Sequence, residues 1–127
     1  MPNWCSNTLY VRGDDDKQVK AFVDSAKDEN NVLSFYKHVP SADTTEAHRA
    51  DWGTKWDAAE SELVDHFDGR AEYTFMTAWC PPDHWLCAIS KQFPTLTFQL
   101  HYDEPGMCFK GVTDAENGEL KDQSISY

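Results

Sequence analysis

The chain has few basic side chains and no long hydrophobic run among its 127 residues. Its 11 lysines and arginines stand against 22 aspartates and glutamates, a formal net charge of −11 at pH 7. Because phosphate contacts need clustered cations, this balance excludes direct binding of nucleic acid and disfavours anionic membrane surfaces. The first residues carry no basic and apolar leader, and no segment has membrane-spanning length, so we expect a cytoplasmic protein.

Signatures of enzymes and metal sites are also lacking. The four cysteines include no C-x-x-C pair, and Cys80 and Cys87, with His84 between them, have no second tight pair, so we expect free thiols and no zinc site. No HExxH, GxSxG or glycine-rich phosphate motif occurs. We therefore expect no catalytic residue, metal or cofactor, the alternative being a dyad of Cys80 with His84 or His101.

Large aromatic side chains are abundant, with 5 Trp, 5 Tyr and 7 Phe. They supply the apolar area that disordered chains lack, so the acidic composition does not indicate disorder. A chain of this length can bury one core, and we expect a single ferredoxin-like domain over residues 1–127.

Hydrophobic periodicity and turn residues divide the chain into strands and helices. Four strands are predicted, at residues 6–12, 33–39, 71–79 and 95–102. A helix follows the Asp14–Asp16 run with Val19, Phe22, Val23 and Ala26 on one face, and a second opens at Pro81 with Trp85, Leu86, Ile89 and Phe93. Residues 107–113 and 119–127 form a C-terminal hairpin around Asn117-Gly118. A long polar insert spans residues 41–69, with a short helix through Leu63, Val64 and Phe67.

This order predicts an α+β fold of the ferredoxin-like sandwich class. The sheet is mainly antiparallel, two helices cover one face, and the long insert lies between strands 2 and 3.

The insert contains two tryptophans around a glycine, which gives it the best case for a ligand site. If their rings converge with Trp79, they could stack on a planar, nucleotide-like group, with charged side chains at the rim. The residues of this candidate site are Trp52, Lys55, Trp56, Asp57, Trp79 and Glu104. The alternative is that Trp4, Trp52, Trp56 and Trp79 form a packed mini-core over the sheet.

The acidic residues gather on the two flanks of the chain and leave residues 73–102 nearly neutral. A charged surface keeps a protein soluble, and it can also attract a partner with a basic surface. The candidate partner-binding residues are Asp14, Asp15, Asp16, Asp24, Asp28, Glu29, Glu60, Glu62, Asp65 and Asp68.

Four motifs carry a resemblance to a known family. They are Met1-Pro2-Asn3-Trp4-Cys5-Ser6-Asn7, the segment from Trp52 to Asp57, Thr77-Ala78-Trp79-x-Pro81-Pro82 and Tyr102-x-Glu104-Pro105-Gly106. In this order the chain resembles the YubB-like family of phage and plasmid proteins with a ferredoxin-like domain of unknown function. The family usually has Ser where this chain has Cys80, and the segment between Pro40 and Trp52 is shorter and more acidic here. The resemblance implies an origin on a mobile element and brings no known chemistry.

Charge and resemblance together predict a non-enzymatic accessory protein of a phage or plasmid, located in the host cytoplasm. Its partner is a host protein with a basic surface, for example a CRISPR effector or restriction enzyme that it inhibits. The alternative is a nucleotide-like ligand at the tryptophan-rich insert. The oligomeric state is left open.

Overall fold

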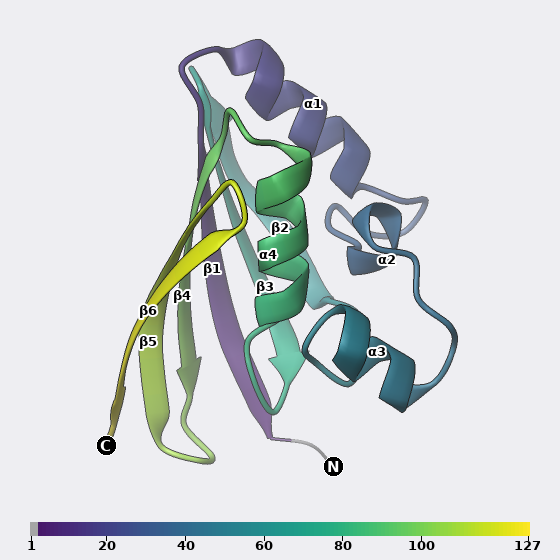
Figure 1. The fold of residues 1–127 in the computed structure, drawn as a ribbon, viewed down its shortest axis with the longest axis vertical. Coiled ribbons are helices and arrows are strands. Elements are labelled where there is room, and N and C mark those ends of the chain that lie inside the picture. Colours follow the sequence, from purple (N-terminus) through teal and green to yellow (C-terminus); the bar gives the residue numbers. More distant parts are fainter. Residues whose placement is uncertain (1–2) are drawn as a thin grey trace.

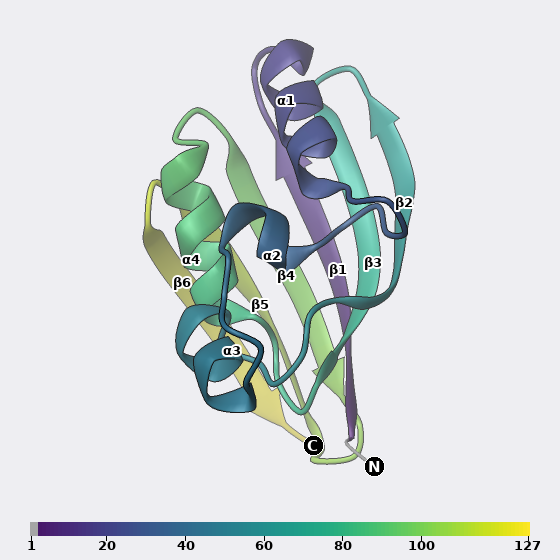
Figure 2. The same cartoon turned by 90° about the vertical axis from the view of Figure 1, so that its right-hand side faces the viewer.

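The computed structural model describes residues 3–127, so Met1 and Pro2 of the N-terminal motif lie outside the described residues. A six-stranded antiparallel sheet has the strand order β2-β3-β1-β4-β5-β6, with the helices on one face (Figures 1 and 2). The strands are β1 (Trp4–Arg12), β2 (Ala59–Phe67), β3 (Arg70–Ala78), β4 (Thr97–Glu104), β5 (Phe109–Glu116) and β6 (Glu119–Ser126). The helices are α1 (Asp16–Ala26), α2 (Phe35–His38), α3 (Thr45–Asp51) and α4 (Asp83–Gln92).

The core lies between the sheet and the helices. Alternate residues of the central strands point into it, as Leu9 on β1, Tyr73 on β3 and Leu100 on β4 show by being fully buried. Phe22 of α1 packs edge-on against Tyr73 and Phe98, with ring centroids 6.0 and 5.4 Å apart. This arrangement confirms the ferredoxin-like α+β fold, in which α1 and α4 cover one face of the sheet.

A capping residue stabilises the start of α1, and an apolar stripe fixes α4 against the sheet. Asp15 is the N-cap of α1, and its carboxylate accepts a hydrogen bond from the backbone N–H of Lys17 at 2.9 Å. The predicted apolar stripe of α4 is buried at Trp85, Leu86 and Ile89. Within residues 3–127, no helix is both long enough and apolar enough to cross a bilayer.

The predicted second strand at residues 33–39 is wrong, because this segment contains the short helix α2. Both hydrogen-bonding edges of β1 are already occupied, by β3 and β4, so this segment cannot pair there. Leu33 and Phe35 instead insert fully buried side chains into the core from a loop and a single helical turn. Their i, i+2 spacing resembles a strand only by coincidence.

The predicted insert and its short helix are also wrong in position and type. The second strand of the fold is β2, which contains Leu63, Val64 and Phe67, while the actual insertion lies between α1 and β2 and carries α2 and α3. Two register shifts in the β2–β3 pairing break the alternation of β2, so its apolar residues fall at helix-like spacing. A tight turn at Asp68 and Gly69 joins β2 to β3, with φ of 47° and 82°.

Candidate functional site

Trp52 belongs to the core and is not part of a ligand site. Its side chain is 2% exposed, and its indole N–H donates to the carbonyl of Val39 at 2.7 Å. The ring stacks on His48 with centroids 4.3 Å apart and meets Phe35 edge-on at 5.8 Å. These contacts fix the end of α3 against the helix layer.

Two acidic members of the predicted ligand site also have structural roles. The carboxylate of Asp57 accepts hydrogen bonds from the backbone N–H groups of Phe35 at 2.6 Å and Tyr36 at 3.2 Å, and so caps α2. Glu104 is fully buried at the end of β4, where Oε2 accepts from the backbone N–H of Met107. Neither carboxylate is presented to a ligand beside Lys55.

The other three tryptophans of the predicted cluster, Trp4, Trp56 and Trp79, are half-exposed at the end of the sheet where β1 begins and β3 ends. Trp4 and Trp56 have ring centroids 6.0 Å apart, and Lys55 Nζ lies 5.0 Å from the centre of the Trp56 ring. Trp79 follows β3 with φ of 70°, a backbone conformation that bulky residues rarely adopt. Among residues 3–127, Trp4 and Trp56 are the only two of the four predicted cluster members whose rings pair, so the single cluster is wrong.

The cysteine and histidine side chains make local structural contacts. Cys80 Sγ donates to the carbonyl of Gly53 at 3.1 Å, and His84 Nδ1 lies 3.0 Å from the carbonyl of Ala50. Burial raises the pKa of Cys80 and raises the pKa of Cys5 to about 12, so both thiols stay protonated at neutral pH. Cys80 and His84 thus each bond a backbone carbonyl, and no hydrogen bond joins them among the described residues.

The predicted acidic residues lie along one lateral edge of the molecule but on both of its faces. Those of α1 belong to the helix layer, whereas Glu62 and Asp65 pair in register with Thr74 and Glu72 and point to the helix-free face. Helix α1 packs over β3, the strand next to the edge strand β2 (Figure 2). All ten side chains are exposed on α1, on its flanks, on β2 or in the β2–β3 turn. Asp16 joins α1 to β2, because its Oδ1 accepts from the backbone N–H of Gly69 at 3.0 Å and lies 3.3 Å from His66 Nε2. We call these ten residues the acidic surface.

Two carboxylates of the acidic surface are held in their charged form by hydrogen bonds. A hydrogen bond from Lys20 at 2.8 Å lowers the pKa of Asp24, and backbone N–H groups of Asn30 and Asn31 lower the pKa of Asp28. Among the described residues, only Asp16 and Asp24 of the ten acids form ion pairs, and the partner of Asp16 is a histidine. Most of the charge is thus free to act on a partner.

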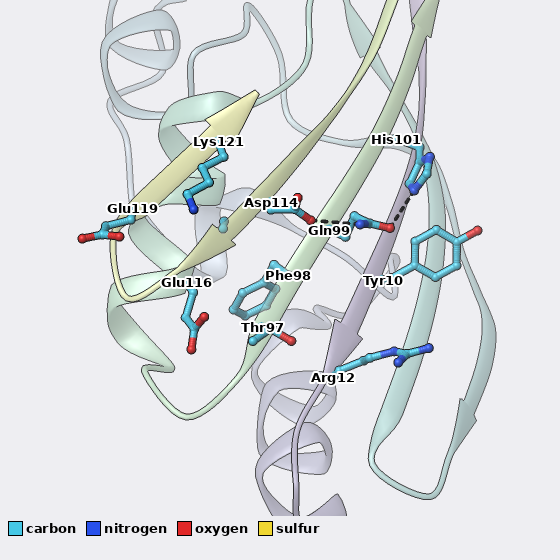
Figure 3. Close-up of a pocket in the computed structure, with 11 residues that line it drawn as sticks. Tyr10, Arg12, Thr97, Phe98, Gln99, His101, Asp114, Glu116, Glu119 and Lys121 are labelled. Carbon is cyan, nitrogen blue, oxygen red and sulfur yellow. Dashed lines mark hydrogen bonds between the residues drawn. The ribbon is translucent and has the colours of Figure 1, made fainter. Parts of the chain in front are cut away.

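The helix-free face of the sheet contains a groove that the sequence analysis did not single out. It has a volume of about 750 Å³ and runs over β1, β4, β5 and β6, with Tyr10, Arg12 and Lys121 among its lining residues (Figure 3). Gln99 donates to Asp114 at 2.9 Å through its amide nitrogen, and its amide oxygen lies 2.8 Å from His101 Nε2 (Figure 3). Since Asp114 orients the amide, His101 must carry its proton on Nε2.

The signal for this groove was present in the alternation of the strands. Gln99 and His101 alternate along β4 with the buried Phe98 and Leu100, so both fall on the helix-free face. Arg12 and Lys121 were missed because they belong to strands whose neighbours in the sheet cannot be known from one sequence.

The fold and its surfaces define an α+β protein of the ferredoxin-like class. Residues 50–126 match the family described as the ferredoxin-like domain in Api92-like protein, and the chain belongs to this family. The crystal structure of Api92 from Yersinia pseudotuberculosis superposes with a TM-score of 0.57 at 18% identity, over 68% of this chain. The chain spans 30% of the length of that protein, so the likeness concerns the fold alone. No curated protein matches the chain.

Proposed function

We propose that the protein is a non-enzymatic accessory protein that binds a partner protein with a basic surface through the acidic surface. The observation that carries the proposal is the placement of ten exposed carboxylates on α1, its flanking residues, β2 and the β2–β3 turn. Complementary charge steers such a partner and speeds its association.

The finer form of the proposal concerns the partner. Following the resemblance to YubB-like proteins, we propose that the chain comes from a phage or plasmid and inhibits a host protein that handles nucleic acid, such as a defence complex. A carboxylate surface can occupy a site that normally binds phosphates, because both present negative charge to the same lysines and arginines.

The test compares two variants of equal charge change. Glu29→Gln, Glu62→Gln and Asp65→Asn together remove three charges from the acidic surface, and Asp43→Asn, Glu46→Gln and Asp51→Asn remove three charges from α3 and the segment before it. Each protein is immobilised and exposed to lysate of the source cells at low and high salt. The wild type and the second variant should retain the same basic protein at low salt, and the first should lose it. Equal retention by both variants would contradict the proposal.

The alternative function, binding of a nucleotide-like ligand, is now supported by Lys55 and Trp56 alone among the predicted site residues. Lys55 lies beside the half-exposed Trp56, which could stack on a base while the ammonium meets a phosphate. Titration with a nucleotide panel, followed by tryptophan fluorescence, tests it directly. A saturable change that is lost in Lys55→Gln would favour this alternative, and no change with any nucleotide would exclude it.

A further inference from the structure

The helix-free side of β3, β1, β4, β5 and β6 carries nearly equal numbers of bases and acids, whereas the whole chain has twice as many acids as bases. The edge strand β2 lies beyond this five-strand region and adds Glu62 and Asp65 to the same face. The bases of the five-strand region are Arg12, Arg70, Lys110 and Lys121, and its acids are Glu72, Asp103, Asp114, Glu116 and Glu119. This region is therefore the part of the surface least repelled by another acidic protein.

Like charges on this face stand directly opposite each other across neighbouring strands. Arg12 of β1 pairs in register with Arg70 of β3, and Glu116 of β5 pairs with Glu119 of β6. Within residues 3–127, none of these four side chains forms an ion pair. Such cross-strand pairs destabilise a sheet unless something outside the pair compensates the charge. The face thus presents two arginines on one side and two glutamates on the other.

We propose that this face binds a second copy of the same chain, forming a two-fold dimer whose axis runs along β4. Two strands lie on each side of β4 before the edge strand β2, with β1 and β3 on one side and β5 and β6 on the other. Rotation about β4 therefore places β1 of one copy over β5 of the other, and β3 over β6. The same surface serves both copies, as two-fold symmetry requires.

The charges match under this rotation. On β4, Thr97 pairs in register with Arg12 of β1, and Glu116 of β5 lies at the same level, one residue beyond the Phe98–Ala115 pair. The rotation therefore sets Arg12 against Glu116 of the second copy. In the same way it sets Arg70 against Glu119 of the second copy. Symmetry makes each of these contacts twice. Each of the four charged side chains that faces a like charge within its own chain thus faces an opposite charge on the other chain, which gives four opposite-charge pairs in the dimer.

The neighbouring rows of the sheet agree with the same axis. A row is a set of residues that pair in register across the five strands. The rotation sets Glu72 over Lys121 of the second copy, because both belong to the row formed by Glu72, Tyr10, Gln99, Asp114 and Lys121.

A second row supplies an apolar contact. It places Met76 over Ile125 of the second copy, and the Ile125 side chain is 59% exposed in the single chain. Asp103 lies on the axis in this row and so faces Asp103 of the second copy, with Lys110 of each chain as its partner in the register with β5.

The dimensions suit a weak dimer. Five strands spaced about 4.8 Å apart and about 27 Å long cover roughly 650 Å² per copy, or roughly 1,300 Å² in total, at the lower end of specific interfaces. Sheets pack face to face about 10 Å apart with strands within about 30°, a gap that arginine and glutamate side chains span from opposite sides. The acidic surface on α1 and the edge of β2 stays outside the dimer.

Charge exchange tests the dimer without knowledge of any other partner. Sedimentation velocity at low ionic strength, over a concentration series up to about 1 mM, should raise the average mass of the wild type toward twice the 14.5 kDa of one chain. Arg12→Glu alone and Glu116→Arg alone each create two repulsive contacts, and each should lower the association constant at least about tenfold. A mixture of these two variants should dimerise again, because one contact then pairs Glu at position 12 with Arg at position 116 and the other is the native pair of Arg12 with Glu116.

The control variant is Arg49→Glu on α3, which makes the same charge change away from this face and should dimerise like the wild type. Circular dichroism verifies that each variant is folded. A wild type that stays at the mass of one chain, single variants that associate as well as the wild type, or a mixture that remains monomeric would each overturn the proposal.

Discussion

Individual residues show why the tryptophan-rich insert was misread as a ligand site. Tryptophan, lysine and aspartate near one another suit both a stacked ligand and a packed corner, and one sequence does not separate the two. The structure does, because Trp52 donates its indole N–H to Val39 and Asp57 caps α2. Neither partner could be foreseen, since residues 33–39 were predicted to be a strand.

Asp57→Ala tests the structural role of this carboxylate. The substitution leaves the buried backbone N–H of Phe35 without an acceptor, so we expect the free energy of unfolding to fall by about 1–3 kcal/mol in urea denaturation. The control Asp65→Ala changes an exposed acid on β2 and should stay within about 0.5 kcal/mol of the wild type. Equal stability of the two variants would contradict the capping role.

His38 should make stability depend on pH. Burial, with a smaller contribution from Lys37, lowers its pKa from 6.5 to about 4, and its ring stacks on Phe22 with centroids 5.1 Å apart. Between these values the unfolded chain binds a proton that the folded chain does not. The stabilising contribution is therefore complete above pH 6.5 and is lost as the pH falls toward 4, by about 2 kcal/mol at pH 5.

Urea denaturation of the wild type and of His38→Gln at pH 7 and pH 5 measures this contribution. Other groups that titrate in this range are common to both proteins, so the difference between their pH responses isolates His38. The wild type should lose more stability on acidification than the variant. Identical losses would show that His38 is not held neutral by the fold.

At the scale of elements, the sequence predicted β1, α1, β3, α4, β4 and the C-terminal hairpin, and it missed β2. The recognised elements have regular periodicity and clear end signals, such as the Asp15 cap and Asn117-Gly118. Asp68-Gly69 is a hairpin signal of the same kind, yet the bulges in β2 concealed the strand before it. Recognition of that turn would have placed β2 and the insertion correctly.

Two glycines with the same backbone conformation test the turn between β2 and β3. Gly69 and Gly118 have φ of 82° and 85°, so an alanine is strained at both. A Cβ on Gly69 would lie 2.7 Å from the backbone oxygen of Gly13, whereas a Cβ on Gly118 meets only the flexible side chain of Lys91. Gly69→Ala should therefore destabilise the protein by at least about 1 kcal/mol more than Gly118→Ala in thermal or urea denaturation. Equal losses would show that the Gly13 contact is not limiting.

At the scale of the whole molecule, charge divides the surface into two regions. The acidic surface on α1 and β2 was predicted residue by residue, because it depends on composition along the chain. The balanced helix-free face was not, because its charge pattern arises only when five strands are placed in order and register. A chain with both regions can bind a basic partner on its outer side while a second copy covers its sheet.

Binding through the acidic surface should weaken as salt is added. We expect the retained partner to lose affinity between 50 and 200 mM salt, since exposed charges more than about 8–10 Å apart are screened at physiological ionic strength. Calorimetric titration of the purified partner at several salt concentrations measures this dependence. The variant that lacks the charges of Glu29, Glu62 and Asp65 should show a smaller salt dependence than the variant changed at Asp43, Glu46 and Asp51.

The most direct test of the account is amide hydrogen exchange of the protein with and without the retained partner. We expect slower exchange in the complex along α1 and β2, including the turn at Asp68 and Gly69, and unchanged exchange in β5 and β6. Protection confined to the helix-free face, or to the segment around Trp56, would contradict binding through the acidic surface.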